Sequence, residues 1–272
     1  MKVRYALLIL GLALAGCGQA PATSNTAATA TVVVGANLPD HSEHGPGKDV
    51  AVIQYDSASV LVTLDLMRGQ LVSSLESARA GDYTAAQQHA ARPLTEHYAQ
   101  IKSLVQENDA ATDVALESAF KTYQQHLAAK SDIATIEQSK AAVEAQLDKI
   151  ESVLVPIHTD VHSRALAGVL KSAAEAYAKS IKDGAFVAPS EYQAAFGFTR
   201  AAETQFARLK PELSTEATQT TQAALDLLIA AMPTIEPPQS VARTADEIAS
   251  ATSNVEDQLG IAQEFGNDTG SP

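Results

Sequence analysis

Residues 175–198 read EAYAKSIKDGAFVAPSEYQAAFGF, and this stretch indicates the fold of the chain. An amphipathic helical pattern runs up to Asp183 and Gly184, an acidic-glycine pair that is typical of a tight turn. Pro189 follows at a position that suits the first turn of a second helix. The stretch therefore predicts a helical hairpin, in which two helices pack side by side in opposite directions.

The same spacing of apolar residues, at steps of three and four, extends over most of the chain from about Asp49 onward. No segment alternates apolar and polar residues in the way that a half-buried strand does. The sequence therefore predicts an all-α fold, an antiparallel bundle of about eight helices with short connections. The predicted helices contain residues 60–78, 83–106 (interrupted by Pro93), 116–127, 136–154, 166–181, 192–209, 217–231 and 241–259.

Pro156 marks the natural seam of the helical part, because proline ends the fourth predicted helix there. About 210 residues could form one domain or two four-helix halves, since single domains commonly contain ~100–200 residues. The predicted boundaries of the two halves are residues 49–155 and 156–260. The last residues, 261–272, are predicted to be a disordered tail.

The first twenty residues, MKVRYALLILGLALAGCGQA, have the features of a bacterial signal peptide. Their apolar run is too short to cross a bilayer. Residues 14–17, Leu-Ala-Gly-Cys, resemble a lipobox, which predicts a signal peptide over 1–16 and lipid attachment at Cys17; the alternative is an ordinary cleaved signal. Gly18 favours the outer over the inner membrane by analogy with enterobacterial sorting. The Ala-, Thr- and Pro-rich residues 17–48 are predicted to be a flexible tether on the periplasmic face.

The chain is acidic, with a net charge of −13. This surface argues against a nucleic-acid partner. It suits cationic ligands, and it also suits simple solubility. The sequence contains no GxSxG, HExxH or phosphate-loop motif, and Cys17 is its single cysteine. We therefore expect a protein that is not an enzyme.

Two pairs of residues, one of two histidines and one of a histidine and a glutamate, suggest a site for a transition metal ion. His158 and His162 are four residues apart, so both imidazoles project from one helix face; alternatively they are exposed polar residues of a first turn. His89 and Glu96 share a face if their helix continues through Pro93, but Glu96 could instead form an ion pair with the nearby Arg92.

Residues 175–198 contain a third candidate group, made of carboxylate and phenol side chains around the turn. Carboxylates and phenols suit hard cations such as ferric iron. The structural alternative is that Tyr177 lies in the core, Asp183 and Gly184 make the turn, and Glu191 interacts with a helix dipole. The stretch also resembles the periplasmic helical domains associated with bacterial high-affinity iron permeases, in its Glu-Tyr-Gln and Gly-Phe elements. That resemblance implies functional roles for Glu175, Asp183, Glu191 and Tyr192.

Ala194 and Arg92 depart from this family pattern, at positions where an acidic residue and a histidine are expected. Two hypotheses follow. The first is a lipid-anchored envelope protein that binds a metal of the iron type as an accessory to uptake or homeostasis. The second is a structural or interaction module that docks a permease or another envelope protein without a metal.

Overall fold

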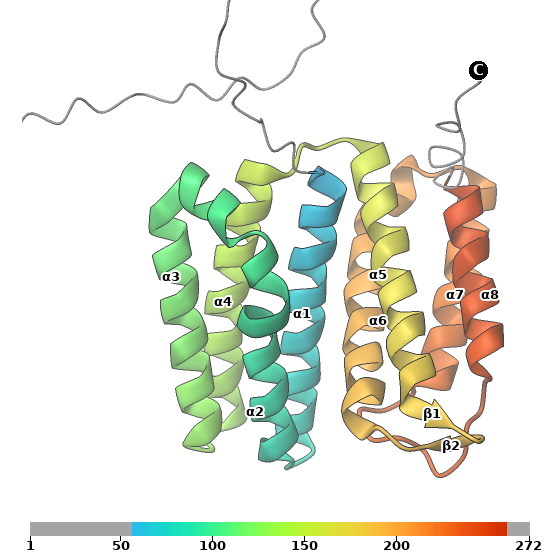
Figure 1. The fold of residues 1–272 in the computed structure, drawn as a ribbon, viewed down its shortest axis with the longest axis horizontal. Helices are drawn as coiled ribbons and strands as arrows, with labels where there is room; N and C mark the ends of the chain where they lie inside the picture. Colours follow the sequence, from blue (N-terminus) through green and yellow to red (C-terminus); the bar gives the residue numbers. More distant parts are fainter. Residues whose placement is uncertain (1–55, 260–272) are drawn as a thin grey trace, which may run out of the picture. The chain divides into compact units, whose positions relative to one another are not determined.

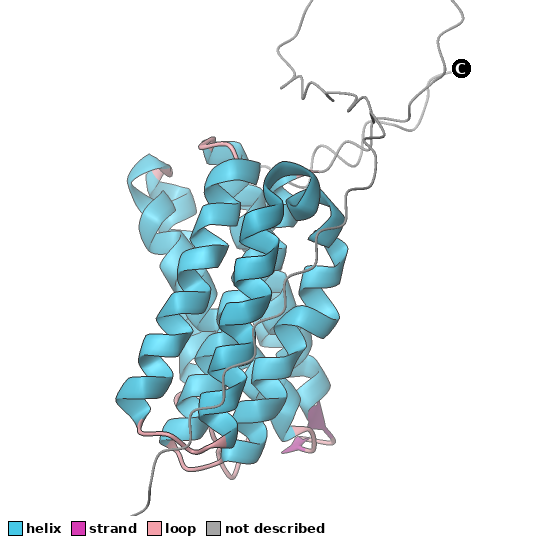
Figure 2. Ribbon diagram, turned by 90° about the vertical axis from the view of Figure 1, so that its left-hand side faces the viewer, coloured by secondary structure: helices cyan, strands magenta, loops and turns pink. Residues whose placement is uncertain are grey.

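The computed structural model describes residues 56–259, which form a bundle of eight α-helices and confirm the predicted all-α class (Figures 1 and 2). The predictions for the signal peptide, Cys17, the tether and the tail concern residues outside this range. Among the described residues, no helix combines the length and the apolar character needed to cross a membrane.

Helix α1 (Ser57–Arg79) is the central element of the described chain. It begins at Asp56, whose carboxylate accepts hydrogen bonds from the backbone N–H groups of Ala58 and Ser59. It packs against α2, α4, α5 and α6, so most of its residues are buried, including polar ones. This helix therefore belongs to the core on nearly all of its faces.

The chain turns at Gly81 and enters α2 (Tyr83–Arg92), which Asp82 caps. A π-helical turn (Pro93–His97) and a 3₁₀ turn (Tyr98–Gln100) follow, because Pro93 has no N–H to continue the α-helical hydrogen-bond ladder. The predicted interruption of the segment 83–106 at Pro93 is therefore confirmed, although the residues after the proline form two short turns before the next α-helix begins.

Helix α3 (Lys102–Ala128) begins well before residue 116, the start expected from the apolar spacing. It has non-helical backbone angles at Asp109, which interrupt its regularity near the first third of its length. The short polar linker 129–132 then leads into α4 (Ile133–Leu154), which packs along α3 (Figure 1).

The hairpin predicted from residues 175–198 is present between α5 (Thr159–Ser180) and α6 (Pro189–Leu209). Its connection contains two strands, β1 (Ile181–Lys182) and β2 (Ala185–Phe186), which pair antiparallel and were not expected from the sequence. Asp183 and Gly184 form the turn with positive φ angles of 52° and 76°.

Helix α7 (Thr215–Ala231) and helix α8 (Ala245–Gln258) complete the bundle. Helix α8 begins at the capping box of Thr244 and Glu247 rather than at the predicted residue 241. The hydroxyl groups of Tyr177 and Tyr192 donate to the carbonyls of Arg243 (2.8 Å) and Thr234 (3.0 Å), which fixes the loop between α7 and α8.

Buried apolar side chains gather in two groups, one from α1 to α4 with the start of α5, and one from α5 to α8. Val62 of α1 packs against both groups. Figure 1 shows the corresponding sets of four helices side by side, with α1 next to α5 and α6. The division into two domains at Pro156 stays a prediction.

Candidate functional site

A buried polar layer made of Gln70, His89 and Gln193 lies between α1, α2 and α6. The side chain of His89 is fully buried, with Nδ1 2.7 Å from Oε1 of Gln70 and Nε2 3.0 Å from Oε1 of Gln193. Both ring nitrogens of this predicted metal ligand are therefore engaged inside the protein.

Burial lowers the pKa of His89 to about 4, because the cationic ring would lose its hydration. The ring is neutral at pH 7, with one donor and one acceptor nitrogen, so one of the two glutamine amides must turn its NH2 group towards it. His89 thus connects α1 and α6 through α2. This arrangement explains its burial without a metal.

A second cluster, made of Arg92, Glu96 and Glu191, lies beside this layer and nearer the solvent. The Arg92 guanidinium is 3.2 Å from Glu191 Oε1 and 3.4 Å from Glu96 Oε1. Of the two alternatives for Glu96, the structure therefore contains the ion pair with Arg92. Arg92 forms ion pairs with two carboxylates that the sequence had suggested as metal ligands, and its charge offsets one of their two negative charges.

His97 lies at the end of the π-helical turn, close to the same cluster. Its ring packs edge-on against Phe198 with 6.2 Å between centroids, and its buried Nε2 has no hydrogen-bond partner. Burial, and to a smaller extent the charge of Arg92, lower the pKa of His97 to about 4. A π-turn with an unpaired ring nitrogen is unusual, and such turns often occur at functional positions.

His158 and His162 both line one cavity of about 160 Å³, near Arg208 and Glu212. His158 is the exposed N-cap of α5 and its side chain makes no capping bond, whereas Nδ1 of His162 is 2.8 Å from Nε2 of Gln205. The structure thus brings this pair together, while His89 and Glu96 do not line the cavity. Within residues 56–259, no group of three or more His, Cys, Asp or Glu side chains is arranged to hold a metal ion.

The four residues singled out by the family resemblance do not form one site. Glu175 is exposed on α5 and Asp183 is exposed in the β-turn. Glu191 pairs with Arg92, and Tyr192 is buried with its ring 5.0 Å from that of Phe186. The structural alternative is therefore confirmed for Asp183, which makes the turn, and for Tyr177, which is buried in the core.

One family comparison bears on this region. Residues 157–264 match the model of the iron permease-associated 4-helix bundle domain. The match confirms the resemblance that was based on the sequence, and it spans α5 to α8, somewhat less than half of the chain. Comparison with curated proteins and with solved structures finds no match.

Sequence patterns did not reveal the polar partners that organise this region. Gln70 and Gln193 look like ordinary surface residues in a helical pattern, although both are buried, at 1% and 7% exposure. The available signal was that apolar residues lie on several faces of α1, among them Val60, Leu61 and Leu66. A helix that is apolar on all sides is typically buried on all sides, together with the polar residues between its apolar ones. Within the matched residues 157–264, the side chain of Gln193 contacts His89 of α2, and that of Gln205 contacts His162 of α5.

Proposed function

We propose that this protein is a lipid-anchored accessory of bacterial iron uptake on the periplasmic face of the envelope. The match of residues 157–264 to the iron permease-associated 4-helix bundle domain supports this proposal. Acylation of Cys17 would supply the anchor, in the outer membrane in preference to the inner one. The proposal assigns no catalytic step to the protein.

The mode of action that we favour is docking to a permease or to another envelope protein. The observation that carries this choice is the Arg92 cluster, where a guanidinium lies within 3.4 Å of both Glu96 and Glu191. A metal ion next to these carboxylates would meet a fixed positive charge at close range. His89 is likewise committed to Gln70 and Gln193.

A second candidate is metal binding by His158 and His162, with Glu212 as a carboxylate from the same cavity. The exposed ring of His158 makes no capping bond, so its nitrogens are accessible. In this version the accessory would bind a transition metal ion loosely and pass it on, because three ligands are not preassembled in the described residues.

The two modes are separated by calorimetry on the chain that lacks residues 1–17. Iron, copper, zinc and manganese ions are titrated into the wild type and into the double variant His158→Ala, His162→Ala. The matched control is His126→Ala, a partly exposed histidine on α3. Micromolar binding that only the double variant abolishes would support the metal candidate.

Docking predicts a different pattern. Metal binding is no tighter than to a generic acidic helical protein, and the protein crosslinks in cells to an iron permease or to another protein of the uptake system. A deletion strain should then grow poorly under iron limitation. Normal growth of that strain, with unchanged iron accumulation, would contradict the role in iron uptake as a whole.

A further inference from the structure

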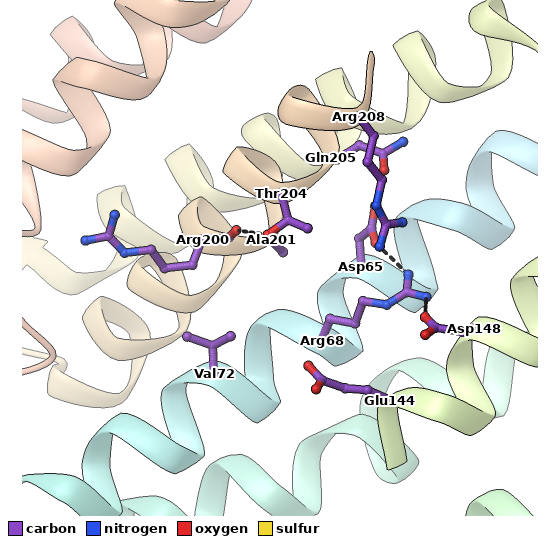
Figure 3. Close-up of a pocket in the computed structure, with 10 residues that line it drawn as sticks. All are labelled: Asp65, Arg68, Val72, Glu144, Asp148, Arg200, Ala201, Thr204, Gln205 and Arg208. Carbon is purple, nitrogen blue, oxygen red and sulfur yellow. Dashed lines mark hydrogen bonds and ion pairs between the residues drawn. The ribbon is translucent and has the colours of Figure 1, made fainter. Parts of the chain in front are cut away.

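A separate cavity of about 240 Å³ lies where α1, α4 and α6 meet (Figure 3). Asp65 and Arg68 enter it from α1, Asp148 from α4, and Gln205 and Arg208 from α6. Nothing in the family comparison or in the histidine patterns assigns a role to this cavity.

The charges around the cavity do not balance. Arg68 is 2.8 Å from Asp65, 2.8 Å from Asp148 and 2.6 Å from Glu151. Arg208 adds a second positive charge, 3.5 Å from Glu151. Each of the three carboxylates therefore has an ion-pair partner, but together they carry one more negative charge than the two guanidinium groups compensate; Glu151 belongs to this ion-pair network and does not itself line the cavity.

The other charged side chains of the lining do not compensate this excess. Glu144 pairs with Lys140 at 2.5 Å, and Arg200 pairs with Glu203 at 2.6 Å. Arg200 also lies over the ring of Phe196, 5.0 Å from its centroid. Figure 3 shows the Arg200 side chain extending away from Asp65, whereas Arg208 extends towards it.

Two hydrogen-bond acceptors of the lining are buried and lack a partner. Oδ2 of Asp65 and Oε1 of Gln205 make no hydrogen bond, although the Asp65 side chain is only 4% exposed and Gln205 is 1% exposed. Burial raises the pKa of Asp65 to about 6, against the opposing effect of Arg68. A buried acceptor without a hydrogen-bond partner costs free energy, so we expect a hydrogen-bond donor in the cavity to pair with these two oxygen atoms.

We propose that this cavity binds a small organic cation with a primary ammonium group. An ammonium group has three N–H donors and no acceptor, so it can donate a hydrogen bond to each of the two free acceptors. Its single positive charge balances the excess negative charge. A metal ion fits less well, because no group of metal-ligand side chains is assembled here or elsewhere in residues 56–259. This inference does not depend on the proposed role in iron uptake.

The competing occupant is water alone. The cavity is large enough to hold several water molecules. Water can donate to both acceptors but cannot supply the missing positive charge. An amine and a carboxylic acid of the same size therefore distinguish the two cases.

The test is calorimetry at low salt with the chain lacking residues 1–17, using propylammonium and propionate as the two probes. We expect propylammonium to bind with a dissociation constant of about 1 mM or tighter. Propionate should not bind measurably. Absence of propylammonium binding at this level, or stronger binding of propionate, would overturn the proposal.

Variants locate the binding. Asp65→Asn and Gln205→Leu should each weaken propylammonium binding about tenfold or more, since each removes one acceptor. Asp226→Asn, the same change at an exposed position on α7, should have no effect. Thr204→Phe fills the mouth of the cavity from an exposed position, leaves the buried network intact and should also abolish binding. Binding that survives both Asp65→Asn and Thr204→Phe lies elsewhere and refutes the assignment.

Discussion

At the scale of single residues, the contact between Gly69 and Gly197 brings α1 and α6 close together. A Cβ atom on Gly197 would lie 2.1 Å from the carbonyl oxygen of Gly69 and 2.2 Å from Oγ of Ser73. The same approach lets the Ser73 hydroxyl donate to the carbonyl of Gln193 at 2.6 Å. The Gly-Phe element of the family pattern thus has a packing function in this chain.

We predict that Gly197→Ala lowers the free energy of unfolding by about 3 kcal/mol or more, because two helix backbones must separate. The control is Gly184→Ala in the β-turn. There the added methyl group meets open space and only the positive φ of 76° is unfavourable, so a loss of about 1 kcal/mol is expected. Urea denaturation measures both values. Equal losses would show that the close helix contact is absent.

His89 makes a second prediction at this scale, on the dependence of stability on pH. Its folded pKa of about 4 is below the unfolded value of 6.5, so the unfolded chain binds more protons between these values. The contribution of the neutral His89 ring to the free energy of unfolding is fully present above pH 6.5, and it is lost as the pH falls towards 4. The loss from His89 alone should reach roughly 2 to 3 kcal/mol between pH 7.5 and 4.5.

The measurement compares the wild type with His89→Gln at both pH values. The variant should lose that much less stability on acidification, whatever its stability at pH 7.5. This difference isolates His89 from His97, which acts in the same direction, and from Asp65, whose raised pKa acts in the opposite direction. An unchanged pH dependence would mean that His89 is accessible to protons in the folded state.

At the scale of elements, α8 shows how local sequence starts a helix. The Thr244 hydroxyl accepts from the N–H of Glu247, and the Glu247 carboxylate accepts from the N–H of Thr244 at 2.8 Å. This capping box lies directly after the loop fixed by Tyr177, so the cap also sets where the loop ends.

Thr244→Ala should therefore destabilise the protein by about 1 kcal/mol, the usual effect of losing an N-cap side chain. The control is Thr122→Ala, an exposed position inside α3, where alanine is the better helix former and no loss is expected. Thermal unfolding followed by circular dichroism compares the two. A neutral Thr244→Ala would indicate that packing on α5 and α7 alone holds α8 in place.

At the scale of the whole molecule, α1 contributes to both groups of four helices. It packs against α2 and α4 on one side and against α5 and α6 on the other. The matched family domain, residues 157–264, does not include it. The C-terminal half therefore buries part of its surface against a helix from outside that domain.

We predict that a fragment comprising residues 156–272 does not fold cooperatively, whereas the chain lacking residues 1–17 unfolds in a single transition. Loss of α1 exposes the face of α6 around Gly197 and removes the hydrogen-bond partners of Gln193. Circular dichroism and urea titration measure both chains. A cooperative transition of the fragment would instead support two independent four-helix halves.

The sequence by itself determined the class of fold and the position of most helix ends. Apolar spacing and the turn at Asp183 depend on a few neighbouring residues, so they can be predicted from the sequence alone. The helix interrupted at Pro93 was predicted less well, because the proline effect on the hydrogen-bond ladder extends over the next two turns of backbone.

Only the tertiary structure decided which polar residues meet. Gln70, His89 and Gln193 come from three helices, and Arg68 of α1 pairs with Asp148 and Glu151 of α4. A sequence pattern indicates on which face of a helix a side chain lies. It does not indicate which neighbouring helix packs against that face. That neighbour decides burial and pKa, so it also decides that Arg92 pairs with Glu191 and that Oδ2 of Asp65 is buried without a hydrogen-bond partner.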